Sequence, residues 1–280
     1  NLKIYKGDVR DSCLLKKIFD DSIFLNSKIS AVIHFAGLKS VNDSFLKPLQ
    51  YWDVNVAGSI NLLKIMQTYD CYTFVFSSSA SIYGNENKIP FKENSKINPM
   101  NPYANTKYIV EKFLNNLFES NKTEWKIASL RYFNPIGAHN SGMIGENPKG
   151  LPDNIFPRIL DVSLGIQKEL KIFGNNWPTY DGTCVRDYLH VMDLAQAHIK
   201  TLEYLLSKKP QILNFNIGTG KGTSVLSLIN EFQKVNKINI AFSYSNKREG
   251  DLPISIADNS LCKEILNWQP SKTLKEMCRD

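Results

Sequence analysis

The feature that most constrains the fold is a succession of strand, helix and strand in the middle of the chain. Thr73–Phe76 is a short apolar strand candidate that leads directly into Ser77-Ser78-Ser79, and the segment from Lys126 to Tyr132 is a second strand candidate. Between them, one face of a helical stretch is apolar at the i, i+3, i+4, i+7 spacing. That face consists of Ile109, Val110, Phe113, Leu114, Leu117 and Phe118. This order predicts a parallel βαβ unit, and therefore an α/β fold.

The start of that helix carries Tyr103 and Lys107. Residues four apart lie on the same helical face, so the Lys107 ammonium can lie beside the phenol and favour its ionised form. A tyrosine needs such help to act as a base, because its unperturbed pKa is ~10. The pair therefore suggests a nicotinamide-dependent enzyme, in which the bound cationic ring would lower the pKa of the phenol further. The serines stand at the carboxyl end of a strand, where open α/β sheets bind ligands. By itself Tyr-x-x-x-Lys also occurs by chance, and one or two of the serines are expected to be helix caps or turn residues.

Composition narrows the class of protein. The net charge is +7, but the 34 lysines and arginines are spread along the chain without an aromatic-interleaved cluster, which argues against nucleic-acid binding. The four histidines show no ligand spacing, and the five cysteines are scattered without Cys-x-x-Cys pairs. We therefore expect no metal and a reducing, cytoplasmic location. No apolar run reaches the length of about 18 residues that a membrane span needs. A targeting signal ahead of Asn1 stays open.

Gly218-Thr-Gly-Lys-Gly-Thr-Ser224 superficially suggests a phosphate-binding loop. It follows the strand candidate from Ile212 to Ile217 and precedes a helix that is expected to start near Val225. A P-loop requires Gly-x-x-x-x-Gly-Lys followed by Ser or Thr, whereas Lys221 here lies between two glycines. The spacing favours a tight turn and a helix cap.

Several motifs together resemble a known family. They are Phe35-Ala-Gly-Leu-Lys39, Asp53-x-Asn55-x-x-Gly58, Ser79-Ala-Ser-Ile-Tyr-Gly84, Tyr103-x-x-x-Lys107, Arg131-Tyr-Phe-Asn-Pro135, Val185-Arg-Asp-Tyr-x-His-Val-x-Asp193 and Arg248-Glu-Gly-Asp-Leu-Pro253. Their order and spacing are similar to those of the extended short-chain dehydrogenase/reductase superfamily, and within it to the UDP-glucose 4-epimerases. The resemblance runs nearly from end to end. The first and last of these motifs in combination are much more specific to the epimerases than any one motif alone.

The resemblance implies a Rossmann-like doubly wound parallel sheet with a smaller α/β substrate domain. One departure is large, because the family opens with a strand and a Gly-rich turn that holds the cofactor pyrophosphate, and no such segment precedes Asn1. Leu2 to Tyr5 looks like the third strand of the family's sheet. We expect a fragment, completed by a companion chain or a missing N-terminal segment, and ending early at Asp280. The expected domains are 1–136 for NAD and 137–280 for the UDP-sugar, with a segment near 185–206 returning to the NAD lobe and 137–157 forming a loop.

The implied reaction is UDP-glucose/UDP-galactose 4-epimerisation through a 4-keto intermediate, by reversible hydride transfer to tightly bound NAD. The implied catalytic residues are Tyr103, Lys107 and Ser79. The implied cofactor residues are Asp8, Val9, Phe35, Ala36, Gly37, Leu38, Lys39, Asn55, Ser79, Tyr103, Lys107 and Phe133. The implied substrate residues are Lys39, Ser79, Tyr103, Asn134, Asn154, Ile155, Lys171, Phe173, Arg186, Arg248, Asp251 and Ser255. A homodimer is also implied.

Other interpretations remain beside these. Arg186 could instead form an internal ion pair with Asp187 or Asp193, and Asn55 and Asn134 could be loop-stabilising amides. Ser255 aligns with a bulky aromatic residue of epimerases restricted to glucose and galactose, so we expect UDP-GlcNAc and UDP-GalNAc to be accepted as well. The alternative functions are another NAD-dependent UDP-sugar enzyme, of the 4,6-dehydratase or decarboxylase type, and a non-catalytic NAD-binding fragment. Dehydration is disfavoured because Ala80 and Ser81 stand where those enzymes usually carry an acid.

Overall fold

The computed structural model describes residues 2–85, 88–148, 150, 152–248 and 250–280. The chain forms two compact units with interleaved segments. The first unit comprises Asn1–Ile82, Pro99–Leu130 and Thr201–Asn214, and the second comprises Tyr83–Asn98, Arg131–Lys200 and Phe215–Asp280. These bounds differ from the expected domains in three places. The segment that returns to the first unit is Thr201–Asn214 and not 185–206, Tyr83–Asn98 belongs to the second unit, and the second unit begins at Arg131 and not after residue 136.

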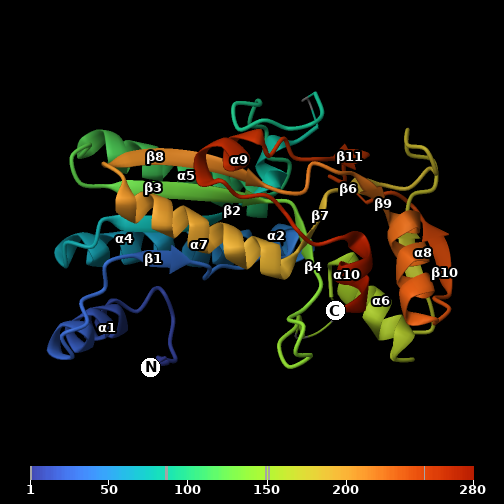
Figure 1. The fold of residues 1–280 in the computed structure, drawn as a ribbon, viewed down its shortest axis with the longest axis horizontal. Helices are drawn as coiled ribbons and strands as arrows, with labels where there is room; N and C mark the ends of the chain where they lie inside the picture. The colour runs from blue at the N-terminus through green and yellow to red at the C-terminus, as the bar shows by residue number, and fades with distance from the viewer. Residues whose placement is uncertain (1, 86–87, 149, 151, 249) are drawn as a thin grey trace. The chain divides into compact units, whose positions relative to one another are not determined.

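The first unit is organised by a four-stranded sheet, whose strands Figure 1 shows side by side. Their order is β1 (Val32–His34), β2 (Thr73–Ser79), β3 (Lys126–Tyr132) and β8 (Gln211–Ile217). The strands β1 and β2 are parallel, with Val32 opposite Phe74. The bounds predicted for β3 are confirmed. The strand β2 continues through all three serines, so Ser77 and Ser78 are not turn residues, whereas Ser79 also accepts a hydrogen bond from the Ser81 amide 3.2 Å away.

Several helices precede and follow the strands of this unit. They are α1 (Ser12–Phe24), α2 (Val41–Leu46), α3 (Pro48–Tyr51), a π-helical turn η1 (Trp52–Ala57), α4 (Gly58–Thr68) and α5 (Pro102–Ser120). The helix α5 begins where Asn101 caps it, because the side-chain oxygen of Asn101 accepts a hydrogen bond from the Ala104 amide at 2.8 Å and Pro102 fits the first turn. Leu114 on its apolar face is fully buried in a core with Met66, Phe74 and Trp125. This packing fixes the helix against the sheet.

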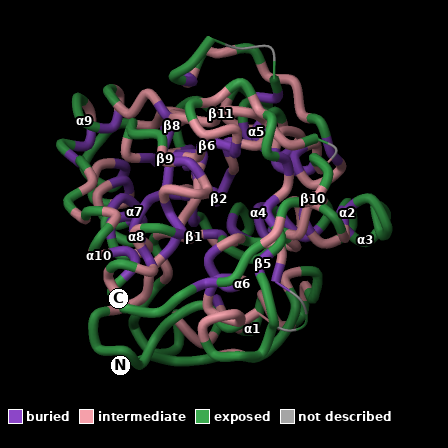
Figure 2. The backbone as a smooth tube through the Cα atoms, turned by 90° about the vertical axis from the view of Figure 1, so that its right-hand side faces the viewer, coloured by how far each residue is buried: buried purple, intermediate pink, exposed green. Residues whose placement is uncertain are grey.

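The prediction of a strand over Leu2 to Tyr5 is wrong for this structure. The segment has irregular backbone, and the side chains of Leu2 and Ile4 are 91% and 81% exposed. Figure 2 shows the N-terminal stretch in the colour of exposed residues. A strand is stable only when its backbone groups pair with a neighbour, and no strand of the described residues pairs with this segment.

The second unit contains three small sheets. The strand β4 (Asn134–Ile136) pairs with β7 (Tyr188–His190), and β5 (Leu170–Phe173) pairs with β10 (Phe242–Ser245), both in parallel. The third sheet has the order β11 (Ile254–Ser255), β6 (Val185–Arg186) and β9 (Thr223–Ser224). Its helices are α6 (Ile155–Ser163), α8 (Val225–Asn236), α9 (Ser260–Leu266) and α10 (Leu274–Arg279). The helix α7 (Val191–Ser207) begins in the second unit and belongs to the first from Thr201 on, and the 3-10 turn η2 (Ala80–Tyr83) passes from the first unit to the second after Ile82. The predicted loop 137–157 is shorter than expected, because α6 already begins at Ile155.

The glycine-rich segment after β8 is a turn and a helix cap, as its spacing predicts. Its amides hold a protein carboxylate, since Asp187 accepts hydrogen bonds from the backbone of Thr219 at 2.7 Å and of Gly220 at 2.9 Å. A Cβ at Gly218 would lie 2.6 Å from the Asp187 carboxylate, so only glycine fits there. The Ser224 hydroxyl then caps α8 by accepting from the Ser227 amide at 3.0 Å. Among the described residues, no helix is long and apolar enough to cross a membrane.

Candidate active site

Tyr103, Lys107 and Ser79 converge at the carboxyl end of β2. Tyr103 lies in the first turn of α5, half-buried, and its hydroxyl hydrogen-bonds the Ser79 side chain. Lys107 follows one turn later and is 94% buried, with its ammonium donating to the Ser77 carbonyl at 2.7 Å. The ammonium also lies 5.0 Å from the centre of the Phe76 ring and 5.9 Å from that of Tyr103. One strand end therefore positions all three predicted catalytic side chains.

The electrostatics of this cluster differ from the expected picture. Burial raises the pKa of Tyr103, and the hydrogen bond to Ser79 only partly offsets this effect. Burial also lowers the pKa of Lys107 to about 8, although the nearby Glu111 carboxylate acts in the opposite direction. The pKa of the phenol is therefore raised in this structure, and the favourable effect of the Lys107 ammonium on its ionised form stays a prediction. The physical reason is that withdrawal from water disfavours the charged form of both groups.

The predicted cofactor residues of the first unit lie on two segments. Residues Phe35, Ala36, Gly37, Leu38 and Lys39 form the loop after β1, at the carboxyl end of that strand. Asn55 holds the loop, because its side chain accepts from the Leu38 amide at 2.7 Å and donates to the Leu38 carbonyl at 3.0 Å. The loop-stabilising interpretation of Asn55 therefore describes its contacts in this structure. Asn55 also donates to Thr106 on α5 at 3.0 Å, which ties the loop to the catalytic helix.

This loop has features that fit a bound dinucleotide. Phe35 is 59% exposed, although it follows a strand whose last residue, His34, is buried. A Cβ at Gly37 would lie 3.1 Å from the Asn55 amide oxygen and 3.7 Å from the Lys107 ammonium. The absence of a side chain at Gly37 keeps the space beside Lys107 open, which is what close approach of a ligand requires.

The remaining predicted cofactor residues are dispersed. Asp8 lies in the exposed N-terminal stretch and pairs with Arg10 at 2.7 Å, and this pair holds the pKa of Asp8 at about 2. Arg10 also binds Asp53 at 2.5 Å. Val9 packs beneath Gly58, where a Cβ would lie 2.6 Å from its side chain. Phe133 belongs to the second unit, where it packs against Phe91.

The second unit holds a polar cavity of about 110 Å³. Its walls include eight of the predicted substrate residues, namely Asn134, Asn154, Ile155, Lys171, Phe173, Arg186, Arg248 and Asp251. These residues come from β4, the start of α6, β5, β6 and the loop before β11. The cavity is also lined by Asp153, Ile172, Cys184, Tyr188 and Val225, which the sequence analysis did not select.

An arginine pair dominates the charge of this cavity. Asp251 lies between the two, 3.1 Å from Nε of Arg248 and 3.7 Å from Nη2 of Arg186. The Arg248 guanidinium stacks over the Phe173 ring, 4.5 Å from its centre. Arg186 donates to the Leu252 carbonyl at 2.7 Å. Two oriented guanidinium groups within one small cavity suit an anion such as a pyrophosphate.

The alternative interpretation of Arg186 does not hold. Asp187 binds the glycine-rich turn, and Asp193 binds Ser271 and Lys272, so neither is the partner of Arg186. Ser255 does not line the cavity but lies opposite Arg186 across the β11–β6 pairing. Lys39, Ser79 and Tyr103 belong to the first unit. Glu249 of the Arg-Glu-Gly-Asp motif lies outside the described residues.

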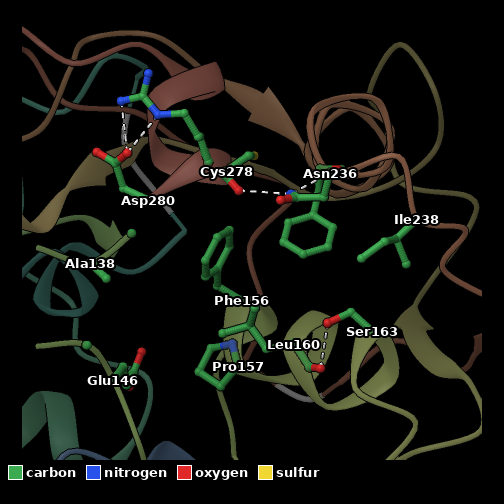
Figure 3. A pocket seen from close by; sticks show the side chains of 14 residues that line it. Ala138, Glu146, Phe156, Pro157, Leu160, Ser163, Asn236, Ile238, Cys278 and Asp280 are labelled. Carbon is green, nitrogen blue, oxygen red and sulfur yellow. Dashed lines mark hydrogen bonds and ion pairs between the residues drawn. The ribbon is translucent and has the colours of Figure 1, made fainter. Parts of the chain in front are cut away.

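A larger cavity of the second unit, about 260 Å³, carries none of the predicted site residues. Figure 3 shows its walls, where Phe156 and Leu160 are apolar neighbours. Several of its polar groups bind one another, since Asn236 donates to the Cys278 carbonyl at 3.0 Å and Arg279 binds the Asp280 carboxylate at 2.9 Å. Size alone therefore does not identify the substrate site, and the smaller cavity has the convergent charges that a ligand needs.

Two further residues of these sites were not predicted from the sequence. Glu111 is 97% buried one turn beyond Lys107, and its spacing on an otherwise apolar helical face was a signal that could have found it. Tyr188 is buried in the cavity wall, and its hydroxyl has no hydrogen-bond partner among the described residues. No sequence signal distinguishes that tyrosine from an ordinary core aromatic residue.

Comparison with known proteins agrees with this geometry. A family model described as GDP-mannose 4,6 dehydratase matches residues 1–280. UDP-glucose 4-epimerase 4 of Oryza sativa subsp. japonica is 44% identical over 280 residues, which cover 100% of this chain and 74% of that protein. The UDP-glucose 4-epimerase of Pasteurella multocida (strain Pm70) is 43% identical and covered to 81%.

Solved structures give the same result. The UDP-glucose 4-epimerase from Stenotrophomonas maltophila, crystallised with NAD and formylated UDP-arabinopyranose, superposes with a TM-score of 0.93 at 42% identity, covering 99% of this chain and 80% of that one. The enzyme from Bifidobacterium longum, in complex with NAD+ and UDP, gives 0.92 at 38% identity, with coverages of 100% and 81%. Because similarity at this level extends over the whole chain, the protein belongs to the UDP-glucose 4-epimerase family of the extended short-chain dehydrogenase/reductase superfamily.

Proposed function

We propose that this chain interconverts UDP-glucose and UDP-galactose by inverting C4 of the hexose through a 4-keto intermediate. The observation that carries the proposal is the cluster of Tyr103, Ser79 and Lys107 at the carboxyl end of β2, in a chain whose relatives are UDP-glucose 4-epimerases. NAD, held by the loop after β1 together with Asn55, Tyr103 and Lys107, would supply the hydride acceptor and return the hydride.

Tyr103 is the proposed proton acceptor for the 4-hydroxyl of the sugar. Ser79 hydrogen-bonds Tyr103, so it can bind the same substrate oxygen and orient the hydroxyl toward the phenol. Lys107, whose pKa is about 8, is mostly an ammonium at pH 7 and places a positive charge beside the Tyr103 ring. That charge favours the phenolate, the form that Tyr103 must have before it can accept the proton of the 4-hydroxyl.

The nucleotide part of the substrate is proposed to occupy the cavity of the second unit. Arg186 and Arg248 would bind its pyrophosphate, because both guanidinium groups are fixed by Asp251 and neither is exposed to bulk water over most of its surface. Phe173 offers an apolar ring beside them. Asn134 and Asn154 would supply amide contacts.

The range of hexoses is proposed to include UDP-GlcNAc and UDP-GalNAc. Ser255 is a small side chain beside Arg186, and a 2-acetamido group needs volume more than a specific partner. Ser255→Tyr should reduce turnover of the N-acetylated sugars and spare UDP-galactose. Turnover of UDP-galactose by an enzyme that leaves UDP-GlcNAc untouched would refute the proposal on Ser255.

Two alternatives are weaker. A 4,6-dehydratase or decarboxylase reaction lacks its acid, because the residues after Ser79 are Ala80, which is buried and apolar, and Ser81. A non-catalytic NAD-binding role has no use for a buried lysine beside the tyrosine. The homodimer, the completing segment or companion chain and the cytoplasmic location stay predictions.

The test is an assay of UDP-galactose with trace NAD+, in the presence of the expected N-terminal segment, with chromatographic separation of the UDP-sugars. We expect UDP-glucose to form, and Tyr103→Phe to lose at least about 100-fold in rate. Lys208→Gln is a matched control, because Lys208 lies after the end of α7 on the surface of the same unit. If a sample that contains bound NAD forms no UDP-glucose, the proposed function is wrong.

A further inference from the structure

Three consecutive residues of β2 bind three residues of α5 that are spaced one helical turn apart. The Ser79 side chain hydrogen-bonds Tyr103, the Ser77 carbonyl accepts from the Lys107 ammonium, and the Ser78 hydroxyl donates to the Glu111 carboxylate at 2.5 Å. The first two contacts belong to the proposed catalytic cluster. The third contact, between Ser78 and Glu111, lies outside that cluster.

Glu111 is an unusual residue for its place. It is 97% buried on the face of α5 that packs into the core, next to Val110 and Leu114. Burial of a carboxylate is costly unless it is paired and hydrogen-bonded. Residues at i and i+4 are neighbours on a helix, and Lys107 is the buried cation at that distance. The two charges therefore lie in the same dry environment.

We propose that Glu111 is a positioning residue for Lys107, whose buried carboxylate keeps the lysine side chain an ammonium while its bond to Ser78 fixes α5 against the end of β2. Without a negative charge nearby, an ammonium withdrawn from water loses its proton more readily. The importance of that ammonium for catalysis rests on the proposed function. The electrostatic effect of Glu111 on Lys107 does not depend on the proposed function.

The other groups around Lys107 cannot replace Glu111. Tyr103 on the same helix is kept neutral by burial, and His34 on β1 is neutral at pH 7, because burial lowers its pKa to about 4. The strand β2 contributes the Ser77 carbonyl and the Phe76 ring.

The charged residues of the helices packed against α5 have partners of their own. On η1, Asp53 binds Arg10, and on α2, Asp43 binds Lys47. Both pairs are exposed to solvent, where charges are screened. In the described part of the chain, Glu111 is thus the carboxylate whose charge acts on Lys107.

The decisive measurement is a titration of Lys107 in the chain itself, by NMR of ¹³Cε-labelled lysine, with Lys107→Met to assign the signal. Glu111→Gln removes the charge and keeps an oxygen that can accept from Ser78. We expect the pKa of Lys107 to fall by about one to two units in this variant. Ser78→Ala is the matched control, because it removes the hydrogen bond and leaves the charge, and should shift the pKa far less.

A folded Glu111→Gln variant with an unchanged Lys107 titration would overturn the proposal, and so would equal shifts in Glu111→Gln and Ser78→Ala. If the glutamine variant does not fold, Glu111→Met replaces the carboxylate by an apolar side chain of similar length. Loss of folding in both would show that Glu111 is only structural, which also overturns the proposal.

Activity supplies a second measurement. The alkaline limb of the pH profile of kcat should move to lower pH in Glu111→Gln by the same amount as the Lys107 titration, because activity is lost as pH rises through that pKa. A purely structural role would lower kcat at every pH without moving the limb. If the wild-type chain does not epimerise, the proposed function fails, while the titration still decides the role of Glu111.

Discussion

Arg248→Ala should weaken the binding of UDP by about 10- to 100-fold. The guanidinium of Arg248 stacks over Phe173 and donates from Nε to Asp251. This leaves its Nη atoms without a hydrogen-bond partner among the described residues, on the wall of a cavity of about 110 Å³. A charge-assisted hydrogen bond to a phosphate contributes about 1.5 to 3 kcal/mol, and 1.4 kcal/mol corresponds to a tenfold change in Kd.

Lys247→Ala is the matched control. Lys247 is the neighbouring residue, its substitution changes the net charge by the same amount, and its ammonium also lies over an aromatic ring, 4.4 Å from the centre of Trp177. It does not line the cavity. We expect less than about a twofold effect on UDP binding, because an exposed charge outside the site acts only through screened long-range attraction.

Isothermal titration calorimetry with UDP measures both variants, and thermal unfolding shows whether they are folded. Equal losses in Arg248→Ala and Lys247→Ala would mean that general attraction, and not a bound guanidinium, governs affinity. An unchanged Kd in Arg248→Ala would refute the assignment of this cavity to the nucleotide.

Three further predictions concern buried groups. Tyr188→Phe should weaken UDP binding severalfold without lowering the melting temperature, because the hydroxyl it removes has no partner among the described residues; a lower melting temperature with unchanged affinity would contradict this. Asp187→Asn should destabilise the chain by about 3 kcal/mol in chemical unfolding, because the carboxylate accepts from the amides of Thr219, Gly220 and Ala257, and a loss below about 1 kcal/mol would contradict that reason. Finally, burial lowers the pKa of His34 to about 4, so the folded state favours the neutral imidazole. Up to about 3 kcal/mol of the free energy of unfolding should therefore be lost as pH falls from 6.5 toward 4. In His34→Gln that part of the pH dependence should disappear.

The sequence predicted best what depends on short spacing. The bounds of β3, the helix α5 with its apolar face and the start of α8 at Val225 follow from periodicity and capping, and the structure confirms them. The failure at Leu2 to Tyr5 has a different origin. That strand was expected from the resemblance to the family, whereas strand formation depends on whether a neighbouring strand is present to pair with.

The cavity proposed for the nucleotide shows a second limit of sequence-based prediction. Its wall residues come from segments as far apart as Asn134 and Asp251, and no periodicity connects them. In the sequence, only the resemblance to a family selects eight of them. Tyr188 and Cys184 were missed because buried aromatic and thiol side chains are ordinary in a core, and only the fold shows that they border a cavity.

The pKa values of Tyr103 and Lys107 are shifted in opposite directions by the same cause, which is burial. Burial disfavours a lone phenolate and a lone ammonium, which raises the pKa of Tyr103 and lowers that of Lys107. The same low dielectric strengthens the attraction between the two charges once both exist, and the ammonium lies 5.9 Å from the centre of the phenol ring. The phenol should therefore ionise readily only while Lys107 is protonated, so the Glu111 carboxylate that keeps it protonated also sets the pH range in which Tyr103 can act as a base.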